Sequence, residues 1–61
     1  MSVTVSVELT DSQALALAQF VKRVGWHEFL ACAVDEDEAY AIRSAVDRVQ
    51  RALAEQGYSP R

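Results

Sequence analysis

Bases are missing from the middle of this chain: no lysine or arginine stands between Arg23 and Arg43. Cysteine, proline and glycine are also scarce, with one, one and two among 61 residues. A single cysteine excludes an internal disulfide framework, the usual support of small secreted domains, so we expect a reducing cytoplasm. With so few glycines and prolines there is no linker. The sequence predicts one domain over residues 1–61, with a disordered tail at about 59–61.

Long hydrophobic runs are absent too. The longest one covers residues 29–34, whereas a helix needs about 20 apolar residues to cross a bilayer. The N-terminus also lacks the basic stretch that opens a signal peptide. We therefore expect neither secretion nor a membrane-spanning segment.

The side chains that would carry catalysis or bind a cofactor are missing as well. His27 and Cys32 are the only residues of their types, and a structural zinc site takes four such ligands. Five positions apart on a helix, they would point about 140° away from each other. We expect Cys32 to be a small buried hydrophobe. The acidic run lacks the glycine and spacing of a calcium loop, and no glycine-rich phosphate loop exists. The sequence predicts no catalytic, metal-binding or cofactor-binding residue, and no enzyme.

A chain of this length has little interior. A domain of about 60 residues buries only about 60% of the surface that its unfolded chain exposes. Hydrophobic residues make up 51% of the sequence, but many are alanines, which bury little area each. We expect a marginally stable monomer that a homodimer or a bound partner would stabilise.

The first residues of the chain alternate between apolar and polar side chains. This period of two, rich in valine, predicts a half-buried β-strand. Nothing else in the sequence offers a second strand, so we expect the strand to pair with its copy across a two-fold axis in a homodimer. The apolar members are Val3, Val5, Val7 and Leu9, and the polar members are Thr4, Ser6 and Glu8.

Two helical patterns follow the alternating segment. Thr10 and Gln13 form a capping box, and Gly25 is expected to be a left-handed stop, which predicts a helix over about 11–24. Asp35 and Glu38 form a second capping box, and an apolar stripe with helical spacing predicts a helix over about 36–56. Residues 26–34 leave room for a short third helix. The predicted fold class is α+β, an N-terminal strand followed by two main helices.

Acidic residues are concentrated where the bases are missing. The stretch carries five acids and no base, and the rest of the chain, with four acids and six bases, brings the net charge to −3. One interpretation is a solvated helix start, which the helix dipole favours. The other is a binding surface for a basic partner, which the absence of compensating bases favours. Glu8 would extend this surface if the fold brought it near. The acids of the stretch are Glu28, Asp35, Glu36, Asp37 and Glu38.

The first half of the chain resembles the ribbon-helix-helix family of dimeric repressors and antitoxins. The similarity lies in residues 3–9, Thr10 and Asp11, the apolar stripe within 17–24, and the turn at Gly25. It implies paired strands whose outward residues enter the DNA major groove. Here those residues would be Thr4, Ser6 and Glu8, without a base among them, and a carboxylate opposes phosphate binding. The late capping box at Asp35 also departs from the family pattern.

Most of the chain also resembles small acidic proteins of proteobacterial plasmids, integrative elements and phages, some of which are type I anti-CRISPR proteins. The similarity lies in residues 7–11, 33–40 and 51–55. It implies a non-catalytic inhibitor that mimics DNA on a basic nucleic-acid-binding protein such as a CRISPR effector subunit, without binding nucleic acid itself. A dimeric DNA-binding repressor or antitoxin is the alternative hypothesis. A domain that only scaffolds a partner through its apolar helical stripe is the third.

Overall fold

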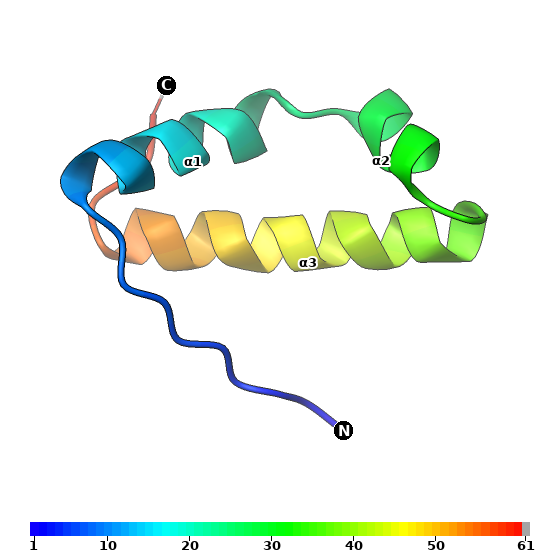
Figure 1. Ribbon diagram of the computed structural model, residues 1–61, viewed down its shortest axis with the longest axis horizontal. Coiled ribbons are helices and arrows are strands. Elements are labelled where there is room, and N and C mark those ends of the chain that lie inside the picture. The colour runs from blue at the N-terminus through cyan, green and yellow to red at the C-terminus, as the bar shows by residue number, and fades with distance from the viewer. Residues whose placement is uncertain (61) are drawn as a thin grey trace.

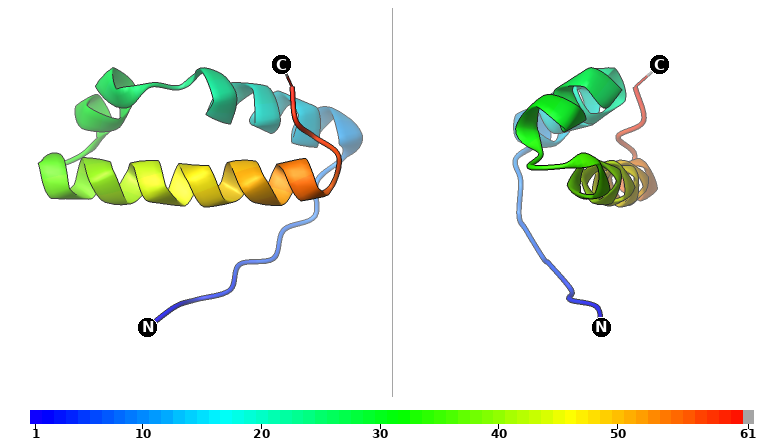
Figure 2. Two further views of the ribbon diagram at one scale, coloured as in Figure 1. Left: turned by 180° about the vertical axis from the view of Figure 1, so that it is seen from behind. Right: turned by 90° about the vertical axis from the view of Figure 1, so that its right-hand side faces the viewer.

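The computed structural model describes residues 1–60 and contains three helices. They are α1 (Asp11–Arg23), α2 (Trp26–Cys32) and α3 (Glu36–Glu55). Figure 1 shows α1 and α2 following one another along the same side of α3, which runs back in the opposite direction. Both shorter helices contact α3. The fold therefore has two helical layers, one of them α3 alone, as the views in Figure 2 also show.

The prediction of an α+β fold is wrong, because residues 1–60 contain three helices and no β-strand. Residues 1–9, which we call the arm, are exposed and leave the helices without pairing to any of them (Figure 1). Alternation marks a strand only where a second strand can accept its backbone hydrogen bonds, and this chain folds its remaining residues into helices. The predicted pairing of strands in a homodimer therefore has no strand to build on. Residues 26–34, where the sequence left room for a short third helix, contain α2.

Local signals set the helix ends, with one exception. The capping box at α1 is confirmed: Thr10 Oγ1 accepts from the Gln13 amide at 3.1 Å, and Gln13 Oε1 accepts from the Thr10 amide at 2.9 Å. The left-handed stop predicted at Gly25 is wrong, since its φ is −124° and the chain leaves α1 through extended Val24. The residue with a left-handed backbone conformation is Gly57, which follows the end of α3 and has a φ of 96°.

The buried core is small and consists mostly of alanine. Ala14, Ala18 and Val21 of α1 are buried, and Ala39 of α3 has no exposed surface. Small side chains let helices approach closely but remove little apolar area from water. Phe29 of α2, 9% exposed, is the largest buried side chain in the part of the chain that the structure describes. The core therefore depends on one aromatic ring and on close helix contacts.

The end of the chain folds back onto the start of α1. The Tyr58 hydroxyl donates a hydrogen bond to Asp11 Oδ1 at 2.5 Å, joining residues that are 47 positions apart. This hydrogen bond, with smaller contributions from burial and from the Asp11 charge, raises the pKa of Tyr58 above its ordinary value of 10.0. The contact fixes the beginning of α1 beside the end of α3.

This contact predicts a pH dependence. The neutral phenol donates to Asp11, whereas a tyrosinate cannot donate and is repelled by the carboxylate. The contact therefore stabilises the fold below the ordinary tyrosine pKa of about 10, and the stabilisation is lost as the pH rises through the raised pKa. In an absorbance titration, we expect one of the two tyrosines to ionise late. Asp11→Asn should abolish the delay and Tyr40→Phe should keep it. Ionisation of Tyr58 at the ordinary value would show that the contact does not form.

Candidate functional site

The acidic run forms the start of α3. Asp35 is the N-cap residue, and Glu36, Asp37 and Glu38 make up the first turn. We call these four residues the acidic turn. All four side chains are exposed. At a rise of about 1.5 Å per residue, the four carboxylates leave the backbone within about 5 Å along the helix axis. The structure thus places four negative charges at one end of the long helix.

Some of these carboxylates also hold the helix starts in place. Asp35 Oδ1 accepts from the Glu38 amide at 2.8 Å, and Glu38 Oε1 accepts from the Val34 amide at 3.2 Å. In the predicted second capping box Glu38 would have bound the Asp35 amide, so its actual partner lies one residue earlier. Glu28 plays the same part at α2, where its Oε2 accepts from the Gly25 amide at 3.1 Å. The helix-start interpretation accounts for these three carboxylates.

Glu36 and Asp37 are different, because neither side chain makes a hydrogen bond or ion pair with another residue in the range 1–60. The only ion pair in this range joins Arg51 to Asp47 at 3.1 Å, further along α3. No guanidinium group there therefore neutralises the acidic turn. The positive end of the helix dipole offsets it by about half an elementary charge. Glu36 and Asp37 form the free pair of the acidic turn, with their charges available to a partner.

The remaining two predicted site residues lie apart from the acidic turn. Glu28 is on α2, the neighbouring helix, and its carboxylate points back to Gly25. Glu8 is in the arm, which begins beside the C-terminal end of α3, since Tyr58 binds Asp11 there. A helix of 20 residues is about 30 Å long, so the base of the arm and the acidic turn lie at opposite ends of the molecule. The structure does not bring Glu8 into the acidic surface.

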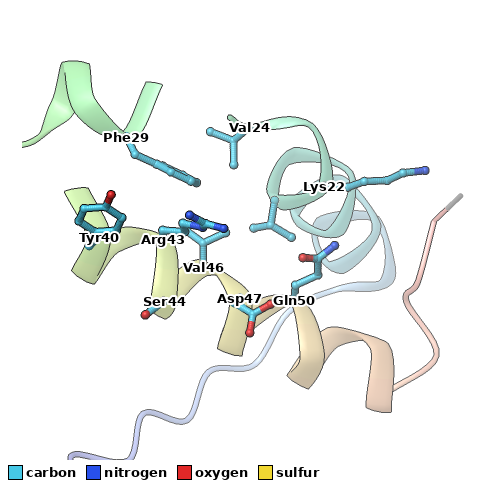
Figure 3. Close-up of a pocket in the computed structure, with 10 residues that line it drawn as sticks. Lys22, Val24, Phe29, Tyr40, Arg43, Ser44, Val46, Asp47 and Gln50 are labelled. Atoms are coloured by element: carbon cyan, nitrogen blue, oxygen red, sulfur yellow. The ribbon is translucent and has the colours of Figure 1, made fainter. Parts of the chain in front are cut away.

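An open groove of about 610 Å³ lies between α3 and the other two helices. Sequence analysis missed it, because its walls come from three helices that no local pattern brings together. In Figure 3, Lys22 points away from the other side chains around the groove. Its charged groups have both signs, so the groove has no single electrostatic preference. The lining residues are Val21, Lys22, Val24, Phe29, Tyr40, Arg43, Ser44, Val46, Asp47 and Gln50.

The polar residues considered for chemistry are both on α2. His27 and Cys32 are exposed, and the expectation that Cys32 is buried is wrong. Cys32 is the last residue of a seven-residue helix whose buried side chain is Phe29, which leaves the thiol outside the small core. Within residues 1–60, no three histidine, cysteine or acidic side chains are grouped as metal ligands would be. None of the helices in this range has the length and apolar character to span a bilayer.

Comparison with known proteins gives one match. A family model described as a family of unknown function, DUF7706, matches residues 1–61. No curated protein and no solved structure matches the chain. The match covers the arm, the three helices and the acidic turn alike, so the protein as a whole belongs to the DUF7706 family.

Proposed function

We propose that this protein is a non-enzymatic acidic inhibitor, which acts in the cytoplasm by placing its acidic turn on the nucleic-acid-binding surface of a basic partner. The main support is the free pair, Glu36 and Asp37. These two carboxylates are exposed, and within residues 1–60 they have no partner. Charges that a fold leaves unused at a helix start can bind lysine and arginine side chains of another protein without first breaking an internal contact.

The charge density of the acidic turn matches that of a nucleic acid. Double-stranded DNA carries one phosphate charge per about 1.7 Å of its axis. The acidic turn carries one carboxylate per residue, and a helix rises about 1.5 Å per residue. A basic groove built to neutralise phosphates would therefore meet a similar density of charge over one helical turn. This likeness is the physical content of DNA mimicry by so small a protein.

A rigid display strengthens the case for the acidic turn. Backbone amides donate hydrogen bonds to the carboxylates of Asp35 and Glu38, and these bonds fix the backbone from which Glu36 and Asp37 project. A partner then need not order a flexible acidic segment on binding, which would cost affinity. The partner suggested by resemblance is a DNA-binding subunit of a type I CRISPR effector, and the protein would block its access to target DNA.

The test is a gel-shift competition with a purified type I CRISPR effector and its target duplex. We expect the protein to prevent duplex binding at low salt and to lose potency as salt rises, because screening shortens the reach of surface charges to about 10 Å at 0.1 M. Neutralising the free pair by Glu36→Gln and Asp37→Asn should weaken inhibition by about 10-fold or more, since both removed charges face the partner.

The matched control removes the same charge from the other end of α3, through Asp47→Asn and Glu55→Gln. This variant should inhibit like the wild type, and circular dichroism should show both variants folded. An inhibitor that tolerates neutralisation of the free pair as well as this control would contradict the proposal. A lane with the protein and duplex alone tests the alternative, since specific binding there would favour a DNA-binding repressor or antitoxin.

A further inference from the structure

The chain exposes more surface than a self-contained protein of its mass. Its accessible surface is 5280 Å². A folded monomer of 6.8 kDa is expected to expose about 3,950 Å². The excess is roughly 1,300 Å², close to the surface of about nine unfolded residues on the same scale. Most of it comes from the arm, residues 1–9, which is exposed throughout and lies away from the helices in Figure 1.

The composition of the arm is not that of a solvated tail. Disordered segments contain few β-branched or large apolar residues, yet five of these nine positions are apolar. Val3, Val5 and Val7 are 84%, 76% and 74% exposed. In an extended backbone these valines project from one side, and Thr4 and Ser6 project from the other. An amphipathic arm of this kind fits a segment that lies on a surface, with its polar side facing water.

The helices carry an apolar surface that fits such an arm. Phe20 of α1 is 60% exposed. It borders a shallow hollow of about 350 Å³ whose other walls are the apolar Ala16 and Val24 and the polar or charged Gln19, Arg23 and Glu28. Exposed aromatic rings beside small apolar residues are typical centres of protein interfaces. We call Phe20, Ala16 and Val24 the Phe20 hollow.

We propose that the protein is a homodimer in which the arm of each copy packs through its valines over the Phe20 hollow of the other. Covering the apolar half of each arm, about 650 Å², with an equal area of the partner's surface buries about 2,600 Å² in total, which is within the range of obligate homodimers. A two-fold axis repeats the arm-to-hollow contact, so one arrangement covers both arms and both hollows.

Two observations favour a second copy over an unrelated protein as the occupant. The first is the small size of the core, whose largest buried side chain is Phe29. A chain with so small a core is stabilised by burying more apolar surface. A second copy of the chain can provide that burial without any other protein. The second is charge. Each copy has a net charge of −3, concentrated at the end of α3 that is remote from the base of the arm. None of the residues around the Phe20 hollow belongs to the acidic turn, so the contact leaves each acidic turn free, and the inference does not depend on what that turn binds.

The first test is sedimentation equilibrium over roughly 1 to 100 µM, a range that spans typical dimer affinities. We expect twice the monomer mass of 6.8 kDa. Val5→Ser with Val7→Ser should raise the dissociation constant by about 100-fold or more, because both valines leave an apolar contact. Thr4→Ala with Ser6→Ala, on the polar side of the arm, should change it by less than about threefold. A monomeric wild type, or a dimer that survives the valine changes, would overturn the inference.

A second measurement covers the case in which the separated copies unfold. The thermal midpoint of the wild type should rise with protein concentration, as it does for any fold coupled to association. The arm-to-hollow contact itself is tested by mixing a Val5→Cys copy with a Phe20→Cys copy, both carrying Cys32→Ser. We expect a mixed disulfide dimer, and much less of it from Ser6→Cys with Phe20→Cys. A concentration-independent midpoint, equal cross-linking of both pairs, or a disulfide formed within one doubly substituted chain would each refute the contact.

Discussion

Replacing Phe29 by alanine is expected to unfold the protein. Phe29 is the largest buried side chain in the described chain, and alanines make up most of the remaining core. Truncating a buried phenylalanine costs about 3–5 kcal/mol. A single core in a domain of this size rarely supplies more than about 3–5 kcal/mol of net stability. The free energy lost by the substitution is therefore about as large as the whole free energy of unfolding expected for this domain. Far-ultraviolet circular dichroism should show most of the helical signal gone at 25 °C without denaturant.

The neighbouring residue provides the control for this experiment. Leu30 lies on the same helix but is 39% exposed, so Leu30→Ala removes a similar apolar side chain from a less buried position. We expect it to cost about 1 kcal/mol and to leave the helices folded. A Phe29→Ala protein that still unfolds cooperatively in urea, at the midpoint of the wild type, would show that Phe29 does not hold the core.

Enlarging Ala39 should produce the second large effect. Ala39 lies in α3 directly after the acidic turn and has 0% exposure, so there is no room for a longer side chain. Ala39→Leu must push α3 away from its neighbours or force strained side-chain rotamers, at a cost of about 1–3 kcal/mol. The free energy of unfolding should fall by this amount, and the urea midpoint should fall with it.

Ala41, two residues further along α3, is the matched position, since it is exposed and leucine is nearly as good a helix former as alanine. Ala41→Leu should therefore leave the free energy of unfolding, measured by urea denaturation, within about 0.5 kcal/mol of the wild type. Equal stability of the two leucine variants would mean that α3 does not pack closely at Ala39.

The helices could be predicted from the sequence wherever their signals were local. The predicted ranges for α1 and α3 end within one residue of the observed ones, because caps such as Thr10 and Asp35 act within a single turn. The prediction of a strand in the arm was wrong for the opposite reason. Its alternation is real, but a strand requires a partner distant in sequence, and no pattern in one chain supplies it. The left-handed stop predicted at Gly25 was wrong because Val24 ends α1 in an extended conformation, and Gly25 is instead the N-cap residue of α2.

The acidic surface was only partly predictable. Exposure of Glu36 and Asp37 follows from their charge, and the cap formed by Asp35 follows from its spacing to Glu38. The separation of Glu8 from these residues could not be read from the sequence, since it depends on α3 folding back along α1. The groove beside Arg43 and the hollow at Phe20 are also products of tertiary packing, which brings residues from different helices to one surface.

The acidic turn contains two residues that stabilise the start of α3 and two whose side chains make no hydrogen bond or ion pair within it. Asp35 and Glu38 are bound to backbone amides, so alanine scanning across the run would confuse frayed helices with lost recognition. The side chains at positions 36 and 37 make no such hydrogen bonds. They are therefore suitable for randomised libraries, in which new sequence pairs could redirect this small helical protein to other targets while its architecture stays intact.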